Sequence, residues 1–355
     1  MRILFSRLIV ISLYPLSILY GCVMVLRNIL YDTGFFKKQF APIFSIGIGN
    51  ITVGGTGKTP HVEYLIKHFF NKKIAILSRG YGRKTKGFLA VDSTMGASQV
   101  GDEPWQFFLK YGKYIHVNVG EKRVLAAQKI HELYPEVDTL IMDDVFQHRA
   151  IQADYSILLC DYNFPFYKDY TFPAGRLREF RCGAKRADII VVSKCPASIS
   201  LEEKNTFRKK INSYAPGIPI AFSSLSYMEV RPLGNSDNIP QKWLLVTGIA
   251  NPKPLVSYLK SQNSLLKHIA YSDHHDFSYS ESLDVINAYY SLNERNAGIL
   301  ITEKDSARLN KETIKLWKDL PLFFIPVEVE LLEGEELLLQ NIAQAMNRRA
   351  GFPIN

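Results

Sequence analysis

The sequence predicts an α/β fold with a three-layer core, in which helices cover both faces of a parallel sheet. Short apolar runs such as residues 74–77 alternate with amphipathic stretches such as residues 122–134, and this alternation is typical of parallel sheets. A glycine-rich segment joins one strand-like run, residues 42–49, to a helical pattern. An uncharged stretch near the N-terminus predicts an extra apolar helix, and 355 residues are enough for two domains.

The glycine-rich segment predicts a phosphate-binding loop. An apolar strand, a glycine-rich turn and a helix start with free amides form the context that such a loop requires. Lys58 would neutralise the β- and γ-phosphates, and the Thr59 hydroxyl would ligate Mg²⁺. The first glycine of the usual pattern is replaced by Thr52, and a glycine-rich turn with a chance Lys-Thr pair is the alternative. We therefore expect a core of the P-loop NTPase type, with a nucleotide loop made of Thr52, Val53, Gly54, Gly55, Thr56, Gly57, Lys58 and Thr59.

Composition narrows the class of partner. A formal charge of +9 and a pI near 9.2 favour an anionic partner such as a nucleotide or a lipid surface. No zinc finger, RNP motif or long basic block is present in the sequence, so we expect no nucleic-acid partner. The four cysteines lack paired spacing, which indicates reduced thiols in a cytosolic compartment.

The N-terminal apolar segment, residues 8–26, is bracketed by Arg7 and Arg27 and interrupted by Pro15 and Gly21. A cleaved signal peptide is disfavoured because no Ala-x-Ala-like site follows. A single membrane span, a monotopic helix in the lipid interface and a helix buried against the protein's own core stay open. We expect membrane association from the cytoplasmic side, at a depth that the sequence leaves open.

The pattern of strands and loops predicts the domain organisation. Further strands are expected at residues 114–119, 139–142, 155–160 and 188–192, all in the first domain. Gly, Pro, Ser and Asn accumulate around residues 216–240, and a new α/β pattern then begins. We expect a membrane-associated helix over residues 1–30, a P-loop core over 31–225, a smaller α/β domain over 226–326, and a C-terminal helix within 327–355 that returns to the core.

An apolar strand that ends in two carboxylates, Asp143 and Asp144, predicts a metal site. In phosphate-loop proteins an acidic residue at this position holds Mg²⁺, directly or through water. The alternative to a metal site is that two solvated aspartates end the strand by chance. His148 follows closely and would orient a carboxylate, contact substrate or serve only the structure.

Two further motifs contain candidate acid–base groups. Residues 101–104, Gly-Asp-Glu-Pro, form an acidic turn before a helix, where Asp102 and Glu103 would favour the helix dipole or face the nucleotide. From that position Asp102 would accept a hydroxyl proton during phosphoryl transfer. Residues 273–277, Asp-His-His-Asp-Phe, resemble a metal cluster, but adjacent histidines point in different directions. One histidine bonded to a carboxylate is the better interpretation.

Cationic residues recur where the predicted strands end. Residues 78–83 follow one strand, residues 121–123 begin a helix, and residues 173–179 lie in a loop. A single arginine is usually a solvated surface residue, but several at the ligand-binding edge of such a sheet make an anionic site plausible. The candidates for contact with substrate or phosphate are Arg79, Tyr81, Glu103, Arg123, His148 and Arg178.

Together these motifs resemble the tetraacyldisaccharide 4'-kinase family of lipid A biosynthesis. Each motif is short, but they run in the family's order over nearly the whole chain, including the apolar N-terminus. Val145 departs from the family, which usually has glycine there, and leaves both carboxylates in place. The matching segments are residues 49–60, 78–83, 101–104, 143–148, 173–179, 273–277 and 302–305.

The resemblance implies transfer of the ATP γ-phosphate, with Mg²⁺, to the 4'-hydroxyl of a tetraacylated glucosamine disaccharide 1-phosphate, which forms lipid IVA. It implies a location on the cytoplasmic face of the inner membrane, contact with membrane lipid, and two domains whose two-stranded linker closes over the nucleotide. It further implies that Asp102 and His274 are the catalytic pair and that Arg123 and Arg178 stabilise charge. The implied metal ligands are Thr59, Asp143, Asp144 and, on weaker grounds, Glu179.

Two other functions fit part of the sequence. A membrane-bound regulatory ATPase or GTPase would explain the loop and the aspartate pair, but it gives no role to Asp102 or to the second domain. A soluble small-molecule kinase or ligase leaves residues 8–26 unexplained. The sequence also leaves open the acyl-chain preference, the oligomeric state, the choice between His274 and His275, and the separate roles of Asp143 and Asp144.

Overall fold

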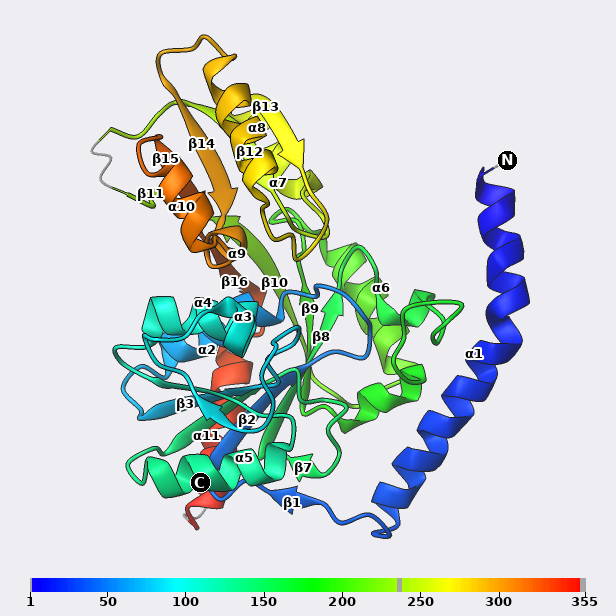
Figure 1. Ribbon diagram of the computed structural model, residues 1–355. Helices are drawn as coiled ribbons and strands as arrows, with labels where there is room; N and C mark the ends of the chain where they lie inside the picture. Colours follow the sequence, from blue (N-terminus) through cyan, green and yellow to red (C-terminus); the bar gives the residue numbers. More distant parts are fainter. Residues whose placement is uncertain (1, 235–237, 352–355) are drawn as a thin grey trace.

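The computed structural model describes residues 2–234 and 238–351, and its first sheet contains nine strands (Figure 1). Seven neighbouring strands, from β10 to β5, run parallel, and antiparallel β16 and β4 flank them. Every strand predicted in this half of the chain is present, within one or two residues of its expected bounds. In sheet order the strands are β16 (Val327–Glu333), β10 (Ile220–Tyr227), β9 (Ile189–Ser193), β8 (Tyr155–Asp161), β2 (Phe44–Gly49), β6 (Thr139–Asp143), β3 (Ile74–Ser78), β5 (His116–Val119) and β4 (Leu89–Ala90).

Helices cover both faces of this sheet because its central strands carry apolar side chains on both sides. On one face Ile46 and Ile141 pack in a core with α2 (Lys58–His68), α4 (Asp102–Tyr111) and α11 (Glu335–Arg349). On the opposite face the strands pack against α5 (Arg123–Leu133) and α6 (Leu201–Asn212). The three-layer α/β core is therefore confirmed.

A second sheet of five strands forms the upper part of the molecule in Figure 1. Its four longer strands run parallel, and the short edge strand β11 pairs antiparallel with β15. Fully buried Trp317, from the C-terminal turn of α10, packs beside Val246 and Ile301 in its core. The elements are β11 (Arg231–Pro232), β15 (Leu322–Ile325), β14 (Ala297–Thr302), β12 (Lys242–Thr247) and β13 (Leu265–Ala270), with helices α7 (Lys253–Ser261), α8 (Tyr279–Tyr290), α9 (Glu303–Ser306) and α10 (Lys311–Trp317).

Two long strands, β10 and β16, join the two sheets. They pair antiparallel from Phe222 opposite Glu333 to Tyr227 opposite Val327, with a bulge after Phe222. Because β16 leads into α11, the chain returns to the first sheet after the second one is complete (Figure 1). We infer a two-stranded linker between two domains. Short elements complete the chain: β1 (Gln39–Phe40), β7 (Ile151–Gln152), α3 (Ala97–Val100), η1 (Phe166–Lys168) and η2 (Arg181–Arg186).

The apolar N-terminus forms one long helix, α1 (Arg2–Asp32), at the side of the first domain (Figure 1). Its part Val10–Asp32 is long and apolar enough to cross a membrane. One side nevertheless contacts the protein. Ser17 is buried, its carbonyl accepts a hydrogen bond from the Thr171 hydroxyl at 2.9 Å, and Gly21 lies so close to Phe180 that a Cβ would clash. The opposite side is exposed and apolar.

We predict that α11 belongs to the core of the first domain. Ile342→Ala removes a fully buried side chain of that core and should lower the free energy of unfolding by about 2–5 kcal/mol. Leu337→Ala in the same helix, where 42% of the side chain is exposed, is the control and should cost much less. Urea unfolding measures this free energy. The relevant transition is the one that ATP shifts to higher urea, because a ligand stabilises only the domain that binds it. A loss confined to the other transition would contradict the assignment.

Candidate functional site

The nucleotide loop connects β2 to α2 at the carboxyl edge of the parallel sheet, where ligands bind in such folds. Gly54 and Gly57 have φ values of 111° and 89°, which side chains with a Cβ rarely adopt. The Asn50 amide donates to the Thr56 hydroxyl at 2.8 Å, and the Ser193 hydroxyl donates to the Thr56 carbonyl at 2.8 Å. The loop is thus held from the carboxyl ends of β2 and β9, which lie on either side of β8. Thr52, which replaces the usual glycine, is buried and pairs with Leu177 instead of facing the loop's open side.

Cations and carboxylates meet beside this loop. Lys58 Nζ lies 3.5 Å from Asp144 Oδ1, and the Arg178 guanidinium donates to both oxygens of the same carboxylate at 3.1 Å. Burial alone would raise the pKa of Asp144, but the charges of Lys58 and Arg178 outweigh it and hold that pKa below its usual value. Asp144 therefore stays ionised as the partner of Lys58 and Arg178, two cations that the sequence predicts to bind phosphate.

Asp143 has a different environment. Its Oδ2 accepts a hydrogen bond from Ser78 at 3.2 Å, whereas its buried Oδ1 has no hydrogen-bond partner among the described residues. Burial raises the pKa of Asp143 to about 6, and repulsion from Asp144 and Glu103 adds to this effect. An unpartnered carboxylate oxygen in such a site is suited to a cation.

The aspartate pair fits Mg²⁺. No cluster of three or more His, Cys, Asp or Glu side chains that would hold a metal occurs in residues 2–234 and 238–351. Mg²⁺ does not need one, because it usually binds through one or two carboxylates together with phosphate oxygens and water. Asp143, with its free oxygen, and Thr59 at the start of α2 would hold the ion.

The other residues predicted to bind phosphate or metal differ in their burial and in their hydrogen-bond partners. Buried Arg123 donates to the carbonyls of Leu77 at 3.0 Å and Asp143 at 2.7 Å, so it fixes the ends of β3 and β6 from below the site. Burial lowers the pKa of His148 to about 4, which keeps that ring neutral. Both oxygens of Glu179 accept hydrogen bonds from Arg186, at 2.7 and 2.9 Å, so this carboxylate is already satisfied. Arg79 is exposed at the end of β3.

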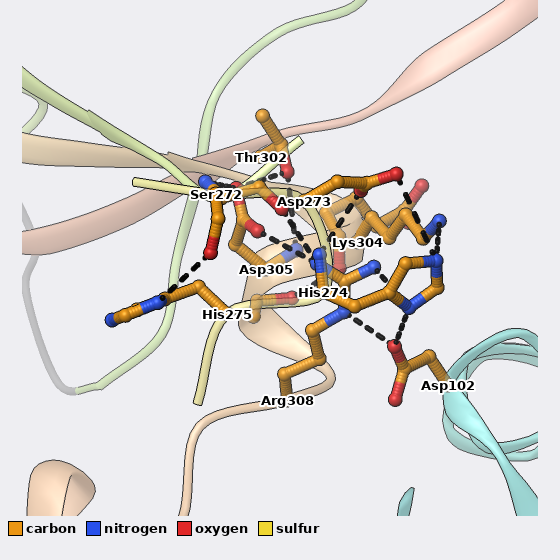
Figure 2. A network of polar contacts seen from close by, with 12 residues as sticks. Asp102, Ser272, Asp273, His274, His275, Thr302, Lys304, Asp305 and Arg308 are labelled. Atoms are coloured by element: carbon orange, nitrogen blue, oxygen red, sulfur yellow. Dashed lines mark hydrogen bonds and ion pairs between the residues drawn. The ribbon is translucent and has the colours of Figure 1, made fainter. Parts of the chain in front are cut away.

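The two domains meet at the N-terminus of α4 (Figure 2). His274 Nδ1 lies 2.7 Å from Asp102 Oδ2, and the Tyr81 ring lies 6.0 Å from the His274 ring. Glu103 pairs with Lys304 at 3.0 Å. Burial would raise the pKa of Asp102, but the hydrogen bond from His274 and the charge of Arg308 keep it below its usual value. The structure thus brings the two predicted catalytic residues together from different domains.

His274 rather than His275 faces Asp102. His274 has a left-handed backbone with a φ of 58°, which turns its side chain toward the first domain. His275 points the other way, with its Nε2 3.1 Å from Glu281 and its ring stacked on Tyr271 at 4.5 Å. The sequence left the choice between His274 and His275 open, and the backbone conformation of His274 decides it.

Comparisons with known proteins cover most of the chain. The family model described as tetraacyldisaccharide-1-P 4'-kinase matches residues 9–347. The tetraacyldisaccharide 4'-kinase of Cytophaga hutchinsonii is 38% identical over 340 residues, 94% of each chain, and that of Bacteroides thetaiotaomicron is 36% identical over 342 residues, 91% of this chain and 90% of that protein. The chain belongs to this family. The crystal structure of LpxK from Aquifex aeolicus in complex with ATP is also similar, with 28% identity, a TM-score of 0.75, and coverage of 95% of this chain and 99% of that chain.

As a member of the tetraacyldisaccharide 4'-kinase family, the chain is an ATP-dependent kinase of lipid A biosynthesis. This assignment excludes the regulatory NTPase and the soluble metabolic kinase considered from sequence.

Several residues at the site were not predicted from sequence. Arg308 contacts Asp102, Gln147 bonds to Arg178 at 3.2 Å, and Lys110 binds Glu303 across the domain boundary at 3.0 Å. The only available signal for Arg308 was its position four residues after Lys304, just beyond the family-matching segment 302–305. A single surface-type arginine gives no indication of a partner 206 residues away.

We predict that Lys58→Ala weakens the handling of ATP itself. The substitution removes the cation that faces the β- and γ-phosphates, so both affinity for ATP and turnover should fall. Calorimetric titration with ATP and Mg²⁺ measures the first, and a phosphoryl-transfer assay measures the second. Lys194→Ala is an unsuitable control because Lys194 bonds to the loop carbonyl of Gly55, so Lys73→Ala, at an exposed lysine just before β3, serves instead. Unchanged affinity and turnover in Lys58→Ala would remove the loop assignment.

Proposed function

We propose that Asp102 is the proton acceptor when this kinase transfers the γ-phosphate of ATP to the 4'-hydroxyl of a tetraacylated disaccharide 1-phosphate. The observation that carries the proposal is the Asp102–His274 pair, whose Oδ2 and Nδ1 atoms lie 2.7 Å apart. Glu103, next to Asp102, is close enough to raise the pKa of Asp143. The proposed proton acceptor and the proposed metal site are therefore close enough for their charges to interact.

The side chains have separate tasks in this reaction. Asp102 orients the hydroxyl and takes its proton late, because phosphoryl-transfer transition states are loose and need little prior deprotonation. His274 orients Asp102 through the hydrogen bond to Oδ2. Lys58 and Arg178 stabilise negative charge on the transferred group, as does Mg²⁺ when it is bound by Asp143 and Thr59.

The substrate class accounts for the exposed face of α1. A disaccharide with four acyl chains stays in the bilayer, so the site must reach the lipid surface. α1 is bound to the site region itself: the Tyr20 hydroxyl donates to the Arg178 carbonyl at 3.0 Å, Arg27 donates to the Gln147 carbonyl at 3.1 Å, and the Asn28 amide donates to Glu179 at 3.2 Å.

These contacts favour a monotopic helix over a span. Were α1 to cross the bilayer, residues 17–28 and the polar groups bonded to them would enter the hydrocarbon layer, at a high cost. We infer that α1 lies along the cytoplasmic face of the inner membrane and that its outward apolar side, which includes Leu19, Val23 and Leu26, contacts lipid. Lys37 and Lys38, just after α1, would contact anionic headgroups.

We predict that Asp102→Asn lowers kcat by about 10²–10⁴, the usual span for loss of a general base, while affinity for ATP changes little. The assay mixes purified protein, γ-labelled ATP, Mg²⁺ and the disaccharide 1-phosphate in detergent and follows the label by thin-layer chromatography. Asp92→Asn, in an exposed turn of the same domain, is the matched control. An equal loss of ATP binding in Asp102→Asn would show that Asp102 is structural or a metal ligand.

We predict that Leu19→Glu combined with Val23→Glu weakens membrane association without damaging the site. Both side chains are more than half exposed on α1, and losing their transfer into lipid should reduce the bound fraction about tenfold or more. Flotation with vesicles that contain anionic lipid measures this, and Leu201→Glu at the exposed start of α6 is the control. Turnover of detergent-dispersed substrate should persist. Undiminished flotation would place the lipid contact elsewhere.

A further inference from the structure

Arg308 is a buried cation whose guanidinium bridges the two domains (Figure 2). Only 4% of its side chain is exposed. Its Nη1 donates to the Gly248 carbonyl at 2.8 Å, within the second domain, and its Nε donates to Asp102 Oδ2 at 2.6 Å, across the boundary. A buried arginine with a carboxylate and a carbonyl in fixed positions has little freedom to rearrange.

The same carbonyl that anchors Arg308 also anchors His274. The Gly248 oxygen accepts a hydrogen bond from the backbone N–H of His274 at 3.2 Å. Gly248 is in turn fixed by Asp305, whose carboxylate accepts from the Gly248 N–H at 3.1 Å and from the Thr302 hydroxyl at 2.7 Å. The Gly248 carbonyl therefore fixes the positions of both Arg308 and His274, and both side chains then contact Asp102.

Charge around His274 selects its tautomer. Its Nδ1 is 2.7 Å from the Asp102 carboxylate, so Nδ1 carries the proton and donates. Nε2 then accepts from Lys304, whose Nζ lies at 3.4 Å. Arg308 Nη2 lies 3.2 Å from the same Nδ1 atom, and Asp273 Oδ2 lies 3.9 Å from Nε2. Arg308 therefore places a permanent positive charge beside the Asp102 carboxylate.

We propose that Arg308 is a positioning residue for the reaction, which holds the Asp102 carboxylate in the orientation that accepts the substrate proton. Both Arg308 and His274 bond to Oδ2, so the other oxygen points away from them and is available to the acceptor hydroxyl (Figure 2). The inference rests on the proposed role of Asp102 and adds a residue to it.

Other contacts hold the domains together without Arg308. Lys304 pairs with Glu103 at 3.0 Å, and Lys110 pairs with Glu303 at 3.0 Å. Loss of Arg308 should therefore leave the domains able to close and should leave the nucleotide loop intact. The expected defect is in the orientation of Asp102, which affects kcat, and not in the affinity for ATP.

The experiment compares Arg308→Gln and Arg308→Lys with the unmodified kinase in the γ-labelled ATP assay. Arg308→Gln should lower kcat by about 10²-fold, the typical effect of a reacting group misplaced by about 1 Å, with KM for ATP within about twofold. Arg308→Lys should recover part of kcat, because one ammonium group restores the charge but cannot serve Gly248 and Asp102 together. Arg295→Gln, an exposed arginine of the same domain, is the control and should match the unmodified enzyme.

A double-mutant cycle with Asp102→Asn separates positioning from a structural role. If Arg308 acts through the Asp102 carboxylate, adding Arg308→Gln to Asp102→Asn should change kcat by less than about threefold. An undiminished 10²-fold effect in that background, or a matching loss of ATP affinity, would overturn the proposal. If Asp102→Asn is inactive and Arg308→Gln is fully active, only the role of Arg308 fails, whereas a fully active Asp102→Asn removes the proposed base itself.

Discussion

The site depends on a set of opposite charges that join the second domain to α4. The first domain contributes Asp102 and Glu103 at the helix N-terminus, and the second contributes Arg308 and Lys304. Near the other end of α4 the polarity reverses, since Lys110 of the first domain meets Glu303 of the second. All three ion pairs are formed together in the structure. Because the proposed catalytic carboxylate and its histidine come from opposite sides of this boundary, these ion pairs hold the two side chains together.

The nucleotide loop is connected to these ion pairs through α2, the helix that follows it. Glu63, one turn after Thr59 on α2, is bonded to Lys110 and accepts from Gln106 at 3.0 Å, and burial raises the pKa of its carboxyl. His61 on the same helix bridges the Gly57 carbonyl, at 2.7 Å, and the hydroxyl of Ser223 in β10, at 3.0 Å. Burial lowers the pKa of His61 to about 4, so this bridge is neutral at physiological pH. α2 thus contacts the phosphate loop, the interdomain charges and the linker strand.

The sequence predicts local features of this molecule well and distant contacts poorly. Continuous apolar runs fix the strands, and the glycine pattern with Lys58 and Thr59 fixes the loop, because both depend on neighbouring residues. Separating Asp143 from Asp144 required the positive φ of 49° at Asp144, which aims its carboxylate at Lys58 and Arg178. Arg308 was not predicted, because its role arises from burial and from a partner in another domain.

Hydropathy left the position of α1 open for a similar reason. It records how apolar the helix is, but not which of its sides packs against the rest of the protein. Ser17 and Gly21 are the residues that reveal the docked side, since a larger side chain at Gly21 would clash with Phe180. Docking brings α1 against Arg178 and Glu179, which belong to the phosphate side of the site. A helix bonded in this way cannot move into a bilayer without the first domain, so the proposed membrane contact and the proposed phosphate site would keep a fixed separation. On this proposal, the outward side of α1 would set how far an acylated sugar must rise from the membrane to reach Asp102.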